Sequence, residues 1–190
     1  MVKPKGNIAA SDAQLNEKTV EETTVFDGKV FRVVVRDVEL FDGSHSRRDV
    51  VLQHGGAAIV ALDSENNVYL VRQFRSPYGK VIYEIPAGKL EKDEDPKLCA
   101  IRELKEETGM EASSVESLGE MYATPGYCSE IIHLYLATGL TCGEGRPDDG
   151  EFLQVHKIPL SEVLEMIDRN EISDAKTLAG ILKTARRVGI

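Results

Sequence analysis

The alternation of apolar and polar residues divides the chain into short segments rich in β-branched residues and a few segments with helical spacing. The strand pattern occurs at residues 23–26, 29–40, 47–54, 57–62, 68–74, 81–85, 115–122, 131–138 and 152–157. Asp27-Gly28 predicts a two-residue hairpin turn, and Asp42-Gly43 and Asn66-Asn67 predict further turns. Because strands and helices interleave, the pattern predicts a mixed α/β fold.

Three segments have the spacing of helices. The first is predicted to begin near Pro96, with Asp95 as N-cap and Gly109 at the C-terminal cap. Leu98, Ile101 and Leu104 recur every third residue, which predicts an apolar stripe that faces the core. Two further helices are expected near residues 161–169 and 174–188.

The chain divides into a tail, a small β region and a larger body. Residues 1–18 are polar and small, and we expect a disordered tail there. Residues 19–54 predict an antiparallel β meander, and residues 55–190 predict the main domain. A sheet as small as the meander buries little apolar area alone, so it is expected to pack on the main body or on a second copy of the chain.

Composition and charge narrow the function classes. The 190 residues are 42% hydrophobic and 29% charged, as in an ordinary globular domain, and no run of about 18 apolar residues predicts a membrane span. The formal net charge of −9 argues against nucleic acid and membrane surfaces as partners. It does not exclude a phosphate-rich small substrate, because bound metal ions can reverse the local field.

The cysteines and histidines give no sign of a disulfide framework or a zinc site. The three cysteines include no CxxC pair, and the four histidines include no HxxxH or HExxH spacing. The first residues also lack the apolar core of a signal peptide. We therefore expect a reducing, cytoplasmic setting.

Three carboxylates lie on one side of the first predicted helix. At about 100° per residue, Glu103, Glu106 and Glu107 form a single acidic stripe. Such a stripe can be a solvated surface, or it can hold a hard divalent cation such as Mg²⁺ or Mn²⁺ between its oxygens. Helical geometry alone leaves both interpretations open.

The residues around the stripe favour the metal interpretation. Gly88 is followed after five residues by Glu94, after seven more by Arg102-Glu103-Leu104, and then by Glu106-Glu107, Gly109 and the apolar Met110. This pattern resembles the Nudix box, the signature of hydrolases that cleave nucleoside diphosphates linked to another group. The resemblance implies an α/β/α sandwich with a mixed sheet, in which the box forms a loop, a helix and a loop.

The resemblance also implies roles for the residues of the box. Glu103, Glu107 and the backbone carbonyl of Ala87 would hold two to three Mg²⁺ ions, with Mn²⁺ as a possible substitute. Glu106 would assist as a ligand or as a base. Arg102 would brace the glutamates through ion pairs, and Gly88, Glu94 and Gly109 would shape the loops.

Flanking segments narrow the branch of the family. The chain resembles the ADP-ribose pyrophosphatase family over residues 26–182. The segments that carry this resemblance are VRQFRSP, YEIPAGKLE, TPGYCSE with Pro125, and the closing DAKTLAGIL. This resemblance implies hydrolysis of ADP-ribose to AMP and ribose 5-phosphate. The alternatives are another ADP-sugar, a GDP-sugar or an oxidised nucleotide as substrate, or a non-catalytic ADP-ribose sensor. The sensor is disfavoured because the chain keeps every acid of the box.

Further site residues follow from the same resemblance. Glu130 would be the general base, against the alternative of a charged residue at a strand start; Glu106 is the second candidate and Glu151 the third. Arg75 would bind a substrate phosphate, unless it only pairs with surface acids. Glu84 and Gly126 are expected beside the substrate, although Glu84 could equally be structural.

The meander is given a role by the resemblance as well. In this branch the meander exchanges across a homodimer and helps to hold adenine. Phe31 could stack on the base, and Arg32 or Arg48 could contact it. Sheet packing and solvated arginines are the alternative interpretations of these three residues.

Overall fold

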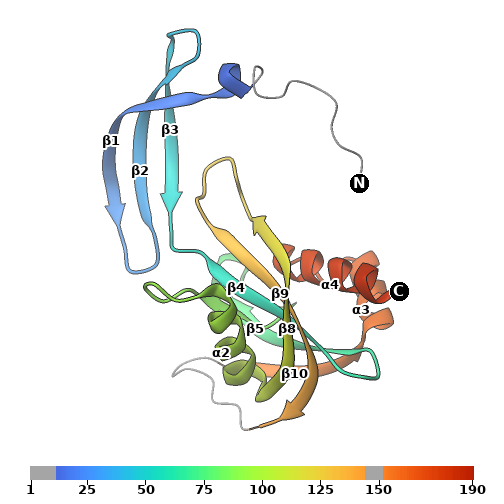
Figure 1. The fold of residues 1–190 in the computed structure, drawn as a ribbon. Coiled ribbons are helices and arrows are strands. Elements are labelled where there is room, and N and C mark those ends of the chain that lie inside the picture. Colours follow the sequence, from blue (N-terminus) through green and yellow to red (C-terminus); the bar gives the residue numbers. More distant parts are fainter. Residues whose placement is uncertain (1–11, 144–151) are drawn as a thin grey trace. The chain divides into compact units, whose positions relative to one another are not determined.

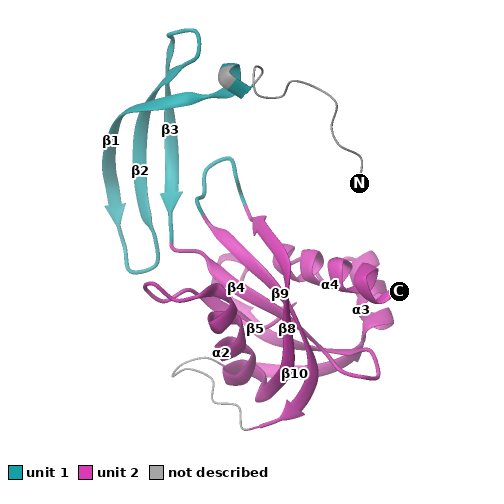
Figure 2. Ribbon diagram, in the orientation of Figure 1, with its two compact units in different colours: residues 1–53, 124–129 teal, residues 54–123, 130–190 magenta. Residues whose placement is uncertain are grey.

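The computed structural model describes residues 12–143 and 152–190 of the chain (Figure 1). These residues form two compact units (Figure 2). Unit 1 contains the chain up to Gln53 together with Thr124–Ser129, and unit 2 contains His54–Ala123 and Glu130–Ile190. The segment at residues 124–129 belongs to unit 1 because the Val51 N–H donates to the Tyr127 carbonyl at 2.7 Å, and the Ser129 N–H donates to the Val51 carbonyl at 2.9 Å.

Unit 1 is built on a three-stranded antiparallel sheet in the order β1-β2-β3. The strands are β1 (Glu17–Asp27), β2 (Arg32–Leu40) and β3 (His45–Leu52), preceded by the short 3-10 helix η1 (Ala13–Leu15). Strand β1 therefore begins six residues before the strand expected at residue 23, inside the segment expected to be a tail. All eleven residues of β1 are exposed, so its sequence lacks the burial pattern that would have shown the strand.

The first turn of unit 1 differs from the prediction, and later turns agree with it. Asp27 pairs with Arg32, so the connection is the four-residue segment 28–31 and not a two-residue Asp-Gly turn. The Gly28 N–H donates to the Phe31 carbonyl at 3.1 Å, without the positive φ that a type I′ turn requires. The turns at Gly43 (φ 81°) and Asn66 (φ 60°) are confirmed.

Unit 2 contains a seven-stranded mixed sheet in the order β10-β5-β4-β9-β8, with β6 paired to β5 and β7 paired to β4. Strands β4 and β9 run parallel, and the other pairs are antiparallel. The strands are β4 (Gly56–Leu62), β5 (Asn67–Arg75), β6 (Lys80–Glu84), β7 (Ala87–Lys89), β8 (Met110–Tyr122), β9 (Ile131–Cys142) and β10 (Leu153–Pro159), with the short 3-10 helix η2 (Ser76–Tyr78) after β5. The three-residue β7 is too short to give a sequence pattern.

Helices cover both faces of this sheet, as Figure 1 shows, and the expected α/β/α sandwich is confirmed. Ala57, Ile59 and Ala61 of the fully buried β4 pack on the side of α2 (Pro96–Thr108). The alternate residues of β4 pack against α3 (Leu160–Asp168) and α4 (Ala175–Val188). In the described ranges no helix is long and apolar enough to cross a membrane.

The ends of α2 agree with the sequence, but its buried face does not. The Asp95 carboxylate accepts hydrogen bonds from the Lys97 and Leu98 N–H groups, and Gly109 ends the helix with φ 70°. The predicted core stripe was wrong at Leu98, which is 62% exposed, and at Ile101, which is 39% exposed, and it is confirmed at Leu104.

The buried residues of α2 are the small Cys99 and Ala100, with Leu104 and Glu107. A step of three residues drifts by about 60° around a helix, which carries Leu98 and Ile101 away from the face that Leu104 occupies. Small side chains on that face let α2 lie close to β4. Of the three glutamates of the acidic stripe, Glu107 lies on this buried face, and Glu103 and Glu106 are half-buried.

Candidate active site

A cavity of about 490 Å³ lies within unit 2. Its walls come from the starts of β4 and α4, from β7 and α2, and from residues at the ends of β5 and β8 and the start of β9. Basic and acidic side chains line it in equal number. These are Arg75, Lys89, Arg102 and Lys176, and Glu91, Glu103, Glu130 and Asp174. The cavity is therefore a charged site of mixed sign.

Close backbone approach brings β7 onto the glutamates of α2. A Cβ atom on Gly88 would overlap the Glu103 carboxylate, and one on Gly56 would lie 2.6 Å from the Gly88 carbonyl oxygen. Glycine is therefore required at position 56, where the neighbour is backbone, and a side chain at position 88 would displace the Glu103 carboxylate. The Ala87 N–H donates to Oε2 of Glu107 at 3.1 Å. The Ala87-Gly88 backbone and the two glutamates expected to bind metal thus form one group.

Arg102 holds three carboxylates at once. Its guanidinium donates to Glu94 (3.0 and 3.1 Å), to Glu103 (2.7 Å) and to Glu106 (2.9 Å). The hydrogen bond from Arg102 lowers the pKa of Glu94 to about 2. The Oε2 atom of Glu94 also accepts a hydrogen bond from the Glu91 N–H at 2.9 Å, which fixes the loop before α2. We call Arg102 with Glu94, Glu103 and Glu106 the acidic cluster.

Glu84 is the centre of a second cluster, in which one carboxylate binds two cations instead of one cation binding three carboxylates. Its carboxylate is only 1% exposed and binds two cations, Arg75 (2.5 and 2.8 Å) and Lys176. Burial alone would raise the pKa of Glu84, but the bonds and charges of Arg75 and Lys176 outweigh burial and lower it. We call Glu84, Arg75 and Lys176 the basic cluster. The predicted alternative for Arg75, an ion pair, is present, and its partner is buried rather than a surface acid.

Glu130 lines the cavity just before β9. Burial raises its pKa, the charge of Lys176 opposes the rise, and that of Asp174 adds to it. A carboxylate with a raised pKa is a better proton acceptor at neutral pH than an ordinary one. This property is what a general base needs.

The donor set of α2 and β7 suits a hard divalent cation. In the described residues no three acidic, histidine or cysteine side chains converge tightly enough to hold an ion by themselves. Mg²⁺, however, binds through one or two carboxylates and keeps several waters or substrate oxygens. Glu103, Glu107 and the Ala87 backbone fit that description.

The structure does not bring every predicted residue to the cavity lining. Gly126, Phe31, Arg32 and Arg48 belong to unit 1, where Arg48 pairs with Glu17 at 2.7 Å and Phe31 contacts Phe26 with ring centroids 5.6 Å apart. The adenine role of Phe31, Arg32 and Arg48 and the place of Gly126 beside the substrate stay predictions. Glu151 lies outside the described residues.

Two lining residues, Lys176 and Asp174, were missed as site residues by reasoning from the sequence. Asp174 caps α4, with its carboxylate accepting the Thr177 N–H. The DAKT segment could have indicated these two residues, because it places an acidic and a basic side chain at the start of a helix.

Comparison with known families assigns the class of protein to which this fold and cavity belong. The NUDIX domain family model matches residues 52–180, and the chain belongs to the Nudix family. The predicted family is therefore confirmed. Members of this family generally use divalent metal ions.

Similar proteins cover almost the whole chain. The chain is 43% identical to the methanol dehydrogenase activator of Bacillus methanolicus, over 87% of this chain and 90% of that protein. It is 41% identical to the ADP-ribose pyrophosphatase of Bacillus subtilis (strain 168), over 88% of this chain and 91% of that protein. A crystal structure of an ADP compounds hydrolase has the same fold, with a TM-score of 0.80 at 19% identity, covering 91% of this chain and 94% of that one.

Proposed function

We propose that the protein hydrolyses the pyrophosphate bond of ADP-ribose to AMP and ribose 5-phosphate. The observation that carries this proposal is the cavity itself, which has metal-type carboxylates at Glu103 on one wall and the cations Arg75 and Lys176 on another. A pyrophosphate with bound metal ions needs both kinds of group. The 41% identity to an ADP-ribose pyrophosphatase supports this substrate over others.

The cofactor in this proposal is Mg²⁺, two to three ions, with Mn²⁺ as a possible substitute, held by Glu103, Glu107 and the Ala87 carbonyl. When bound, such ions stabilise negative charge on phosphoryl oxygens and lower the pKa of a water ligand. Arg102 keeps Glu103 in place, because its Nη1 donates to Oε1 of Glu103 at 2.7 Å.

The remaining chemistry belongs to side chains of the cavity. Arg75 orients the pyrophosphate through its guanidinium, with Glu84 holding the arginine. Glu130 takes a proton from the attacking water, the water oxygen bonds to one phosphorus, and the bridging oxygen leaves with the other phosphate. Glu106 is the second candidate base. Its carboxylate accepts a hydrogen bond from Arg102 at 2.9 Å, whereas Glu130 lines the cavity.

A substrate panel tests the proposal. We expect ADP-ribose to give AMP and ribose 5-phosphate, with kcat/KM well above that for a GDP-sugar or an oxidised nucleoside triphosphate. Faster turnover of a GDP-sugar would make that the substrate class. Tight ADP-ribose binding in calorimetry without turnover in Mg²⁺ would instead support the sensor.

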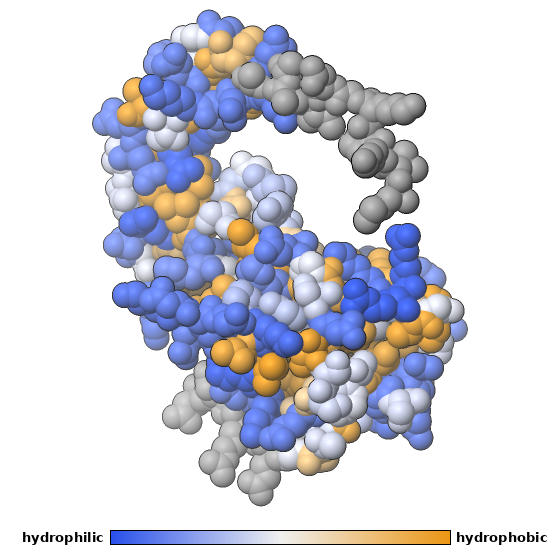
Figure 3. Space-filling model, viewed as in Figure 1, coloured by the Kyte–Doolittle hydropathy of each residue, from blue (hydrophilic) through white to orange (hydrophobic). Residues whose placement is uncertain are grey.

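The assembly in this proposal is a homodimer in which the meander packs on a second copy and Phe31, Arg32 and Arg48 help to hold adenine. Support comes from apolar side chains that unit 1 leaves exposed, some of which are visible in Figure 3. They are Val20, Val25, Phe26, Val30 and Phe31. Light scattering should report twice the monomer mass, and Phe26→Ser should shift it toward the monomer.

A cytoplasmic location is also part of the proposal. All three cysteines are free thiols, with Cys142 exposed, as expected in a reducing compartment. Fractionation of the native host is the direct check.

A further inference from the structure

The first turn of α4 is fixed against the residues that follow β6. The Ile85 N–H donates to the buried Thr177 hydroxyl at 2.9 Å, and that hydroxyl donates to Asp174 at 2.6 Å. Further along, a Cβ atom on Gly180 would lie 3.0 Å from Cδ1 of Ile85, so the helix approaches closely there too. Glu84 therefore meets a helix end whose position is firmly set.

Lys176 lies on this turn and points its ammonium group at two carboxylates. It pairs with Oε2 of Glu84 and with Oδ2 of Asp174, the latter at 3.1 Å. The Lys176 side chain is 14% exposed, whereas that of Arg75 is 38% exposed. Of the two cations on Glu84, the lysine is thus the more deeply placed and the arginine is the one more open to the cavity.

The hydrogen bonds of Arg75 leave part of its guanidinium for a ligand. Nε donates to Oε1 of Glu84 and Nη2 donates to Oε2. No hydrogen bond from Nη1 is found within residues 12–143 and 152–190. Lys176 is a second cation on Glu84, besides pairing with Asp174, so the buried carboxylate does not depend on Arg75 alone for its counter-charge.

We propose that Lys176 is a positioning residue for hydrolysis of the nucleotide sugar: by sharing Glu84 with Arg75, it holds the arginine toward the cavity with charge available for the pyrophosphate. This inference rests on the proposed function. Without Lys176, the buried Glu84 would have Arg75 as its only cation within the described cluster. The arginine would then be held more tightly by Glu84 and would bind a phosphate less well.

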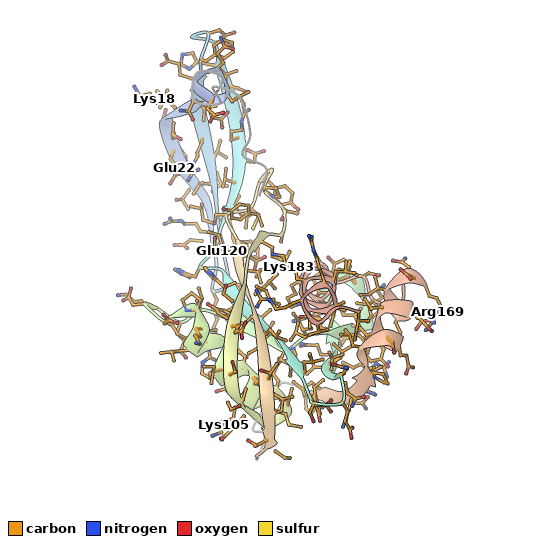
Figure 4. All side chains as sticks on the ribbon, turned by 45° about the vertical axis from the view of Figure 1, so that its right-hand side comes forward. Lys18, Glu22, Lys105, Glu120, Arg169 and Lys183 are labelled. Carbon is orange, nitrogen blue, oxygen red and sulfur yellow. The ribbon has the colours of Figure 1, made fainter. Side chains whose placement is uncertain are left out.

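Lys176→Met measures the effect. We expect KM for ADP-ribose to rise about 10-fold, as for loss of one charge-assisted interaction, with a smaller change in kcat. Lys176→Arg should recover part of the loss because it restores the charge. Lys183→Met is the matched control, since Lys183 lies on the same helix (Figure 4), is exposed and donates to the Leu118 carbonyl at 2.7 Å. Its KM should stay within about 2-fold of wild type.

A double-mutant cycle separates action through Glu84 from direct contact with substrate. In a Glu84→Gln background there is no carboxylate to neutralise, so adding Lys176→Met should change KM by less than about 2-fold. If the full 10-fold effect persists in that background, Lys176 contacts the substrate itself and the positioning role is wrong. An unchanged KM in Lys176→Met alone contradicts it equally.

A binding readout keeps this inference distinct from the proposed function. Calorimetry with ADP-ribose and no metal should show the same weakening in Lys176→Met as the KM does. Wild-type protein that does not turn over ADP-ribose would defeat the proposed function, whereas turnover that Lys176→Met leaves unchanged would defeat only the role of Lys176. If Met at 176 prevents folding, Lys176→Gln decides by the same criteria.

Discussion

The acidic and basic clusters use the same ion-pair chemistry in opposite proportions. In the acidic cluster one arginine holds three carboxylates, and in the basic cluster one carboxylate holds two cations. The first leaves an excess of negative charge for metal ions. In the second, Lys176 also pairs with Asp174, and two cations share the buried Glu84, which leaves Arg75 able to bind phosphate oxygens as well. A protein with a net charge of −9 can still bind an anion in this way, because one cavity is lined by the metal-type carboxylate Glu103 and by the cations Arg75 and Lys176.

The largest effect is expected on the acidic side. Glu103→Gln and Glu107→Gln should each lower kcat/KM by about 10³-fold, or about 4 kcal/mol of transition-state stabilisation, because they remove metal-binding charge. Steady-state kinetics with ADP-ribose and Mg²⁺ measures this. Glu111→Gln is the control, because Glu111 is exposed and pairs with Lys105 at 2.7 Å. Near wild-type activity in both Gln variants would end the metal assignment.

The next effect concerns Glu130, the proposed general base. Glu130→Gln should lower kcat by about 10²-fold or more and leave KM nearly unchanged, as expected for loss of a general base. Glu116→Gln on β8, which removes an exposed ion pair with Arg187 of α4, serves as control. Retained kcat in Glu130→Gln, together with loss in Glu106→Gln, would move the base to Glu106.

On the basic side the effect should fall on binding. Arg75→Met should raise KM about 10- to 100-fold, because a guanidinium binds phosphate oxygens in a paired geometry that methionine lacks, and Arg75→Lys should be intermediate. Arg169→Met changes an exposed arginine after α3 (Figure 4) and should leave KM unchanged. A fall in kcat with an unchanged KM would show that the basic cluster does not act through substrate binding.

Sequence reasoning was most successful where local chemistry decides the structure. The caps of α2 at Asp95 and Gly109 and the turn at Asn66 follow from the conformations that these residues favour. The spacing of the box also located Arg102 and its glutamates.

Tertiary context decided the features that the sequence missed. Leu98 and Ile101 have helical spacing, yet the small Cys99 and Ala100 face β4. The partners Glu84 and Lys176 lie 92 residues apart, so only the fold shows that they share one cluster.

The dependence of kcat on pH tests whether Lys176 of the basic cluster acts on Glu130. The base must be ionised, so kcat should fall as the pH drops through the pKa of Glu130, which burial raises above its ordinary value. Lys176 favours the charged form, and Lys176→Met should therefore move this acidic limb to higher pH. An unmoved limb would show that the two groups do not interact. Lys183→Met again provides the reference.

The smallest effect is on stability. The folded-state pKa of Glu94 is about 2, below its ordinary value, so its bond to Arg102 stabilises the fold above the ordinary value and loses that effect as the pH falls toward 2. Glu94→Gln should cost about 1–2 kcal/mol of unfolding free energy at pH 7 and much less near pH 2. Denaturant titrations at the two pH values measure the difference, and an equal cost at both would contradict the ionic origin.

The most direct test of the central claim is product analysis of ADP-ribose with Mg²⁺ in ¹⁸O-labelled water, for wild type and Glu103→Gln. We predict equal amounts of AMP and ribose 5-phosphate from the wild-type protein, one labelled oxygen in one product, and almost no product from the variant. Intact ADP-ribose with the wild-type protein, or the same products at the same rate from Glu103→Gln, would contradict the account.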